Sequence, residues 1–482
     1  MNQIQFLILL IATIPLLNCL LLKIYSHNFI DKFCVILFFV SLIGIHAKLD
    51  EAPSYLSLIK IFPNVSLGFF IDRIALGFLF LLSFIWIIFI FYSQRFLQLS
   101  PIKNEHNFRI FFTLIIAFAT LSIISKNLLT LLLFYNLLIL LCYFFVSNFL
   151  HKSESKFSRL FIFLLYLESA FFFLAAVATY KFSGSIEFSS KAIIAENFDL
   201  NNYRLVFLFY CCGLFLSTLA PFYLFYRTNI NLEPLFLYVF FFLGYALVSL
   251  FIFLRILSSI FDVTSFSAIL GEVGFGFFEI VFLSNMLLAS GFLIFSRGIK
   301  ASFFYLFFQQ FTFTLFAIFF FEKFAVIRVY LPLLSFLLGF TLCFLTISNL
   351  ALYLTRAQDK QLDGIFYRLT ITCSLLLFAL ANMAGIAPAV GLIEKFFIFK
   401  IILEKDLWIS LAILLVNFIG VAAFSYKIFR PLFSRQIKNI SEDDIAIAKN
   451  IDFDSNLILT GLVVAILMFL GAIGLTQNFA SL

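Results

Sequence analysis

Apolar runs of about 20 residues follow one another through almost all of this 482-residue chain. A helix of that length can cross the hydrocarbon core of a bilayer while it satisfies its own backbone hydrogen bonds. The chain is 63% hydrophobic and 12% charged, which is more apolar than a soluble core requires. The sequence therefore predicts an all-α polytopic membrane protein with about 14 transmembrane helices. The runs lie at roughly 4–22, 33–47, 73–93, 109–125, 127–149, 158–181, 203–226, 232–255, 275–296, 301–321, 329–355, 368–388, 407–429 and 457–476.

No long polar insertion interrupts these runs, so residues 1–482 are expected to form a single membrane domain. The longest polar stretch, 430–455, carries acidic residues at 442–444 and is predicted as a polar loop or amphipathic surface segment before the last helix. If the N-terminus lies outside and the helices alternate, most of the 32 Lys and Arg fall in inward loops. Because cytoplasmic loops are enriched in Lys and Arg, both termini are predicted outside, and the basic loops indicate topology rather than nucleic-acid binding.

Motifs for cofactors and metals are missing from the sequence. All seven Cys lie in apolar segments without a CxxC pair, and the four His show no metal-ligand spacing. No nucleotide-binding loop, haem motif or iron–sulfur pattern occurs. We therefore expect no metal and no cofactor, and no nucleophile–base set indicates a standalone enzyme.

Lys395 lies inside an otherwise apolar stretch that runs from Thr370 to Ile402. A Gly/Pro-rich break at 385–391 precedes it, and a short helix of about 391–403 is expected to follow. An ionisable group at membrane depth is costly, and transporters often interrupt helices at their binding sites. Such a Lys can take up and release protons. Alternatively, Lys395 neutralises a helix C-terminus or pairs with an acid on a neighbouring helix, because the adjacent Glu394 is expected to point to another face.

Two more acids lie inside predicted helices, Glu168 in 158–181 and Glu279 in 275–296. Each could pair with another helix or line a cavity on a proton path. The alternative for both is an internal hydrogen bond without a role in transport.

Four further stretches carry motif signals in a fixed order. Asp72 heads the third helix, where a carboxylate is favoured by the helix dipole and acts as a cap. Asn136 lies within Ser125 to Tyr143, and Lys300 follows Arg297 at a loop–helix junction. The stretch from Gly213 to Pro234 contains Leu216 and Pro221, and the break before Lys395 contains Gly385, Pro388 and Gly391.

Over about residues 64–435, these stretches together resemble the antiporter-like membrane subunit of Mrp-type multi-subunit cation/proton antiporters and of respiratory complex I (NADH-quinone oxidoreductase subunits L, M and N). The resemblance implies an inverted-repeat fold with broken helices. Within this family, the stretch from Phe396 to Arg430 is most similar to the D-type subunit of the Mrp antiporter, with the N-type subunit of complex I as the alternative. Gly385, Pro388, Gly391 and Lys395 match the family's "G-x-x-P-x-x-G-F-x-x-K", with Leu392 in place of the Phe, and in the family that Lys is the exit-side proton carrier.

The chain departs from the family along the proton path: the next helix, between Arg227 and Arg255, lacks the family's central relay Lys or His, and both positions of the gating pair differ. Asn136 stands where the family has a buried Glu, and Leu216 stands where its partner Lys is expected, five residues before Pro221. An amide can hydrogen-bond but does not carry a proton near neutral pH. Both members of the gating pair are therefore replaced.

Three functions stay open from the sequence. The first is a subunit of a multi-subunit monovalent cation/proton antiporter that contributes to proton, and in some members Na⁺, translocation through a partly degenerate path. The second is an accessory subunit that keeps the fold without pumping, and the third is a proton-translocating subunit of complex I. All three imply a bacterial cell inner membrane protein whose partners are other membrane subunits and the lipid bilayer, with no nucleic acid.

Overall fold

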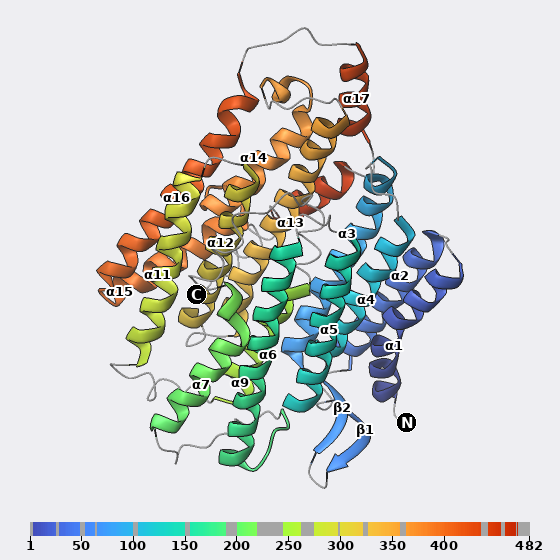
Figure 1. Ribbon diagram of the computed structural model, residues 1–482, viewed down its shortest axis with the longest axis vertical. Helices are drawn as coiled ribbons and strands as arrows, with labels where there is room; N and C mark the ends of the chain where they lie inside the picture. The colour runs from blue at the N-terminus through green and yellow to red at the C-terminus, as the bar shows by residue number, and fades with distance from the viewer. Residues whose placement is uncertain are drawn as a thin grey trace. The chain divides into compact units, whose positions relative to one another are not determined.

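The computed structural model describes residues 3–25, 28–48, 54–62, 65–99, 105–149, 155–188, 200–218, 244–261, 274–296, 299–321, 326–356, 363–434, 442–454, 458–468 and 470. Two compact units emerge, and each is described by itself. Figure 1 labels their helices and strands. Unit 1 comprises Met1–Ile90, Ile102–Asn229 and Val239–Phe275, and unit 2 comprises Phe91–Pro101, Ile230–Tyr238 and Gly276–Leu482. The single membrane domain over 1–482 and the antiporter-like region over 64–435 stay predictions.

Unit 1 is built mainly from helices that coincide with the apolar runs. Its elements are α1 (Gln3–Ile24), α2 (Asn28–His46), β1 (Ser54–Phe62), β2 (Val65–Ile71), the first part of α3 (Arg73–Leu99), α4 (Glu105–Ile123), α5 (Leu128–Phe149), α6 (Ser155–Ser183), α7 (Leu200–Phe215), the 3₁₀ turn η2 (Leu216–Thr218) and α9 (Leu247–Ser259). Close packing of α7 on α6 depends on Gly213, because a Cβ there would lie 2.6 Å from the backbone nitrogen of Phe172.

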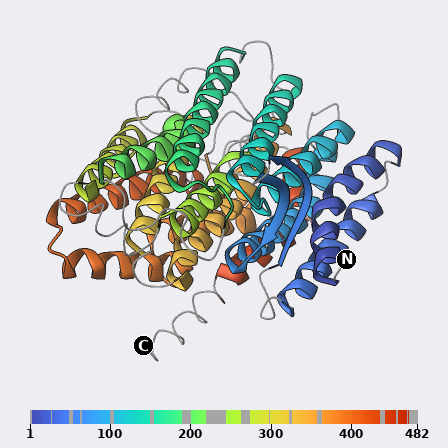
Figure 2. The same cartoon turned by 90° about the horizontal axis from the view of Figure 1, so that it is seen from below.

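A β-hairpin is the one departure from the predicted all-helical fold among the described residues. β1 and β2 pair antiparallel, with Ser54 opposite Ile71 and Phe62 opposite Val65, and Figure 2 shows them as a curved pair of arrows. The segment is too short and too polar to cross a bilayer, and alternating Ser and apolar residues favour a strand. The backbone of Phe69 also bridges Ser125, which fixes the hairpin against the start of α5.

Unit 2 contains α11 (Gly274–Phe295), α12 (Ile299–Phe321), α13 (Val326–Arg356), the 3₁₀ turn η5 (Ile365–Tyr367), α14 (Thr370–Ala384), α15 (Val390–Glu404), α16 (Trp408–Leu432), α17 (Glu442–Asp452), a short helix over 458–468 and the end of α3. In α13 an 18-residue window is 89% buried, against 33% in α16, so α13 lies in the core of this unit. Phenylalanine rings of α12 and α13 interlock there, as in the edge-on contact of Phe303 with Phe344 at 4.8 Å.

The chain is a multi-pass membrane protein. Eight of the described helices are long and apolar enough to span a bilayer, and several shorter apolar helices accompany them. Each of the fourteen predicted runs overlaps a described helix, although fourteen complete crossings stay a prediction. In the stretch 430–455, predicted as a polar loop or an amphipathic segment, the structure places α17.

Candidate functional site

The break between α14 and α15 forms where the sequence predicts it. Gly385 ends α14 in the left-handed conformation, with φ of 72°, which Gly adopts without the strain that a side chain would add. The chain then passes through a cis Ala387–Pro388 bond before α15 begins at Val390. The last carbonyl groups of α14 therefore face the start of α15 instead of continuing a helix.

Asn382 holds the two sides of this break together. Its amide nitrogen donates to the backbone oxygen of Ser335 on α13 at 2.9 Å, and its Oδ1 accepts the N–H of Gly391 at 2.8 Å. Gly391 and Gly339 leave room for this approach, since a Cβ at either residue would overlap Asn382. One amide side chain thus links α13, α14 and α15.

Lys395 is 4% exposed and turns back toward the break. Its Nζ donates to the backbone oxygen of Asn382 at 3.3 Å and lies 5.2 Å from the centre of the Phe313 ring on α12. A Cβ on Gly385 would come within 2.5 Å of the Lys395 side chain. The ammonium therefore rests against a helix C-terminal carbonyl and an aromatic face, both of which favour a cation.

Glu394 corrects the sequence-based expectation that it points away from Lys395. The Glu394 Oε2 and Lys395 Nζ atoms are 3.9 Å apart, and both residues are buried, Glu394 at 2% exposure. The two side chains converge because both turn toward the polar groups at the break, where Glu394 lies beside Ser335. Glu394 lines a narrow gap together with Gln310, Thr314, Ser335, Phe336, Phe340, Asn382 and Met383.

Glu168 lies in unit 1, fully buried on α6. The hydroxyl of Tyr245, in the π-helical turn that leads into α9, donates to its Oε1 at 3.2 Å. Next to Glu168 in the chain, Ser169 donates a hydrogen bond to Asn136 on α5. Leu216 lies in η2 at the end of α7 and presents no polar group. Unit 1 thus contains a buried acid, while Asn136 and Leu216 are both neutral.

The other predicted positions are distributed along the chain. Asp72 caps α3 by accepting the N–H of Ala75 at 2.8 Å, and it forms an ion pair with Arg255. Lys300 and Glu279 lie in α12 and α11, but their side chains are outside the described residues, as is the whole of Pro221. Gly385, Pro388, Gly391 and Lys395 are the predicted positions that the structure brings together at one place.

Sequence reasoning missed a buried polar cluster on α11, α12 and α16. The amide nitrogen of Gln309 donates to Ser290 Oγ and to the backbone oxygen of Asn417, each at 2.8 Å. Further along α16, Lys427 donates to the backbone oxygens of Leu293, in the last turn of α11, and of Ser296, directly after it. In the sequence, this cluster could have been recognised from the polar residues that interrupt the apolar runs. Among the side chains described, no group of three or more His, Cys, Asp or Glu gathers as a metal site.

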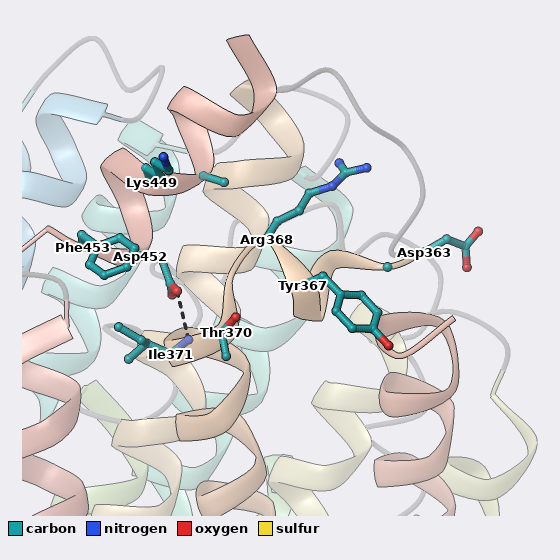
Figure 3. A pocket seen from close by; sticks show the side chains of 10 residues that line it. Asp363, Tyr367, Arg368, Thr370, Ile371, Lys449, Asp452 and Phe453 are labelled. Carbon is teal, nitrogen blue, oxygen red and sulfur yellow. Dashed lines mark hydrogen bonds between the residues drawn. The ribbon is translucent and has the colours of Figure 1, made fainter. Parts of the chain in front are cut away.

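A pocket of about 420 Å³ opens at the other end of α14 (Figure 3). Asp452 at the end of α17 reaches into the first turn of α14, where its carboxylate accepts the N–H of Ile371 at 2.9 Å and the N–H and hydroxyl of Thr372, each at 2.8 Å. Arg368 and Lys449 also line the pocket. This carboxylate supplies the N-terminal cap that Leu369 does not provide to α14.

Taken together, these features define a polytopic helical membrane protein with a broken helix and a buried acid–lysine pair at the break. No protein-family model matches the sequence. A stretch of 64 residues is 30% identical to part of NADH-quinone oxidoreductase subunit N from Desulforamulus reducens, and it spans 13% of this chain and 13% of that protein.

Solved structures share the fold over nearly the whole chain. A chain of the Mrp complex from Dietzia sp. DQ12-45-1b matches with a TM-score of 0.80 and 14% identity, over 99% of this chain and 96% of that one. A chain of the membrane-bound sulfane sulfur reductase, an archaeal respiratory membrane complex, matches at 0.75 and 15% identity, with the same coverage. A chain of respiratory complex I from Thermus thermophilus matches at 0.65 and 13%, over 96% and 97%. The resemblance expected from the sequence is therefore confirmed at the level of the fold.

Proposed function

We propose that this chain is a membrane subunit of a multi-subunit monovalent cation/proton antiporter and that it contributes to proton translocation. The observation that carries the proposal is the burial of Lys395 at the helix break, in a fold shared with a chain of an Mrp complex. A charged group inside a membrane domain is costly to keep, and its usual use is in ion or proton movement. We also propose that Na⁺ is the cation that the complex exchanges for protons.

Lys395 is the central proton carrier in this proposal. Its ammonium contacts a carbonyl oxygen and an aromatic ring, and neither partner fixes it with a short ionic bond. It can therefore change its protonation without breaking a strong ion pair. Glu168 and Glu279 are the other proposed members of the path, while Asn136 and Leu216 leave that path without the family's gating pair.

Two alternatives have specific support. The stretch similar to NADH-quinone oxidoreductase subunit N favours a proton-translocating subunit of a complex I-type NADH-quinone oxidoreductase. Asn136 stands where the family has a buried acid, and its side-chain oxygen accepts a hydrogen bond from Ser169. This stable neutral contact favours an accessory, non-pumping subunit. In every case the proposed partners are other membrane subunits of the same assembly.

The proposed location is the bacterial inner membrane, with both termini outside. Its support is the excess of Lys and Arg in alternate loops, which marks the cytoplasmic side of a membrane protein. Lys449, on the surface of α17, falls on that inner side in this arrangement.

The test is proton flux in vesicles that contain the chain with its co-purified partner subunits, driven by a gradient of Na⁺ or K⁺. We expect Lys395→Ala to abolish most of the flux while the complex still assembles. Lys400→Ala is the matched control, because Lys400 lies on the same helix with its side chain 59% exposed. Full flux with Lys395→Ala would refute the role of this residue, and an assembled wild-type complex without flux would support the accessory subunit. Co-purification with NADH- or quinone-linked subunits would favour the complex I alternative.

A further inference from the structure

Glu394 gives this chain a buried acid beside Lys395, although both members of the family's gating pair are replaced. The two positions that would carry the gating Glu and Lys in the family are Asn136 and Leu216, and neither residue titrates near neutral pH. Among the described side chains, Glu394 and Lys395 form the one pair of a buried carboxylate and a buried ammonium within 4 Å. An acid and a base are therefore both present, next to each other at the helix break in unit 2.

The contact between these two groups is loose. At 3.9 Å, Glu394 Oε2 and Lys395 Nζ are beyond hydrogen-bonding distance. The Lys395 donor goes instead to the Asn382 carbonyl, and Glu394 lines the gap beside Ser335 of α13. A small side-chain rotation would bring Nζ and the carboxylate into contact, whereas a short, fully bonded ion pair would hold both charges in place.

Glu394 also faces the narrow gap between α12, α13, α14 and α15. The polar groups that α12, α13 and α14 present there belong to Gln310, Thr314, Ser335 and Asn382, and Glu394 is the one titratable residue among the described residues of the lining. The amide nitrogen of Gln310 is buried and has no hydrogen-bond partner among the described residues. Glu394 thus has Lys395 on one side and a polar lining on the other.

We propose that Glu394 and Lys395 together form the proton-carrying pair of this chain, with Glu394 receiving the proton from the Gln310 side and passing it to Lys395. This inference rests on the proposed function. In the step, the O–H bond of the carboxylic acid breaks and an N–H bond forms on the neutral amine, so the products are a carboxylate and an ammonium. One proton moves and the pair stays neutral overall before and after the step.

Neutrality is the physical advantage of this arrangement. A lone charge in a low-dielectric interior is strongly disfavoured, and an opposite charge on the neighbouring group offsets part of that cost during the transfer between the two groups. A pair of neighbours on one helix also needs no second titratable group on α5 or α7. The replacements at Asn136 and Leu216 are then compatible with proton movement through unit 2.

The test compares Glu394→Gln with Glu404→Gln in the purified complex. Glu404 is a matched control, because it pairs with Lys400 on the same helix at the same 3.9 Å but with its side chain 58% exposed. We expect Glu394→Gln to lower cation-driven proton flux roughly a hundredfold, the scale that loss of a positioned proton-transfer group commonly costs, and Glu404→Gln to leave it unchanged. Flux at the wild-type level in Glu394→Gln overturns the inference.

A second readout does not depend on transport. Infrared difference spectra between acid and alkaline buffer should show the C=O band of a buried protonated carboxyl group, and the band should disappear in Glu394→Gln but not in Glu404→Gln. If wild-type vesicles show no flux, the proposed function fails while this band still decides whether Glu394 exchanges a proton. A carboxyl C=O region that is the same in wild type and in Glu394→Gln refutes the pair, because Glu168 contributes equally to both. If Glu394→Gln fails to assemble, Glu394→Asp replaces it, because Asp keeps a carboxyl group. We expect Glu394→Asp to retain both the band and part of the flux. Loss of the band in an assembled Glu394→Asp complex counts against the pair.

Discussion

Replacement of Asp452 by Ala should destabilise unit 2 more than any change to the neighbouring surface residues. Asp452 is 2% exposed and accepts three hydrogen bonds, from the N–H of Ile371 and from the N–H and hydroxyl of Thr372. Hydrogen bonds to a charged acceptor contribute about 1.5–3 kcal/mol each, and loss of a helix cap alone costs about 0.5–2 kcal/mol. Water from the adjoining pocket can reach the half-buried Ile371, whereas Thr372 is fully buried and loses its partners.

We therefore expect Asp452→Ala to lower the free energy of unfolding by about 3 kcal/mol, and Asp452→Asn by about half as much, because one amide oxygen still accepts. The assay is denaturant-induced unfolding of the purified protein in detergent. Lys449→Gln is the control, since Lys449 lines the same pocket without holding α14, and it should have no measurable effect. An Asp452→Ala protein as stable as Lys449→Gln would show that the cap does not support α14.

Two further changes test other contacts of unit 2. Gly391→Ala places a methyl group against the Asn382 carbonyl, so we expect it to lower the free energy of unfolding by about 1–3 kcal/mol and to reduce proton flux. Gly291→Ala is the control, because its Cβ would meet no atom within 4 Å, and it should be neutral in the same unfolding and flux assays. Equal stability of the two Ala variants would contradict the close approach of α14 and α15. Lys427→Met removes the donor to the carbonyls at the end of α11 and should cost about 1–2 kcal/mol in denaturant unfolding, while Arg430→Gln at the exposed end of α16 should not. An unchanged midpoint for Lys427→Met would mean that water replaces the ammonium.

The helices of this protein could be predicted because an apolar run of sufficient length has few other solutions in a membrane. The break before α15 was also predictable, since Gly385 and Pro388 interrupt the helix for local reasons. The hairpin β1–β2 was missed, because a short stretch of mixed polarity between two apolar runs is equally compatible with a loop. Its pairing with the start of α5 depends on residues that are distant in sequence, such as Phe69 and Ser125.

The candidate site was predicted only in part. Burial of Lys395 followed from the apolar residues around it, but helical spacing alone placed Glu394 on another face. Two long side chains that begin on different faces can still approach each other beside a helix break, as Lys395 does when it turns toward the Asn382 carbonyl and comes within 3.9 Å of Glu394. The cap of α14 by Asp452 joins residues 80 positions apart in the chain, and no local pattern reports such a contact.

The ion pair of Asp72 and Arg255 has a consequence for the synthesis of the chain. The two residues are 183 positions apart, and the guanidinium of Arg255 also lies against the rings of Phe70, Phe188 and Phe251. Since a ribosome delivers the N-terminal segments first, Asp72 and β2 emerge long before their cation does. The hairpin can therefore pack against α9 only when most of unit 1 has already entered the membrane. Arg255 thus completes contacts with segments that were synthesised much earlier.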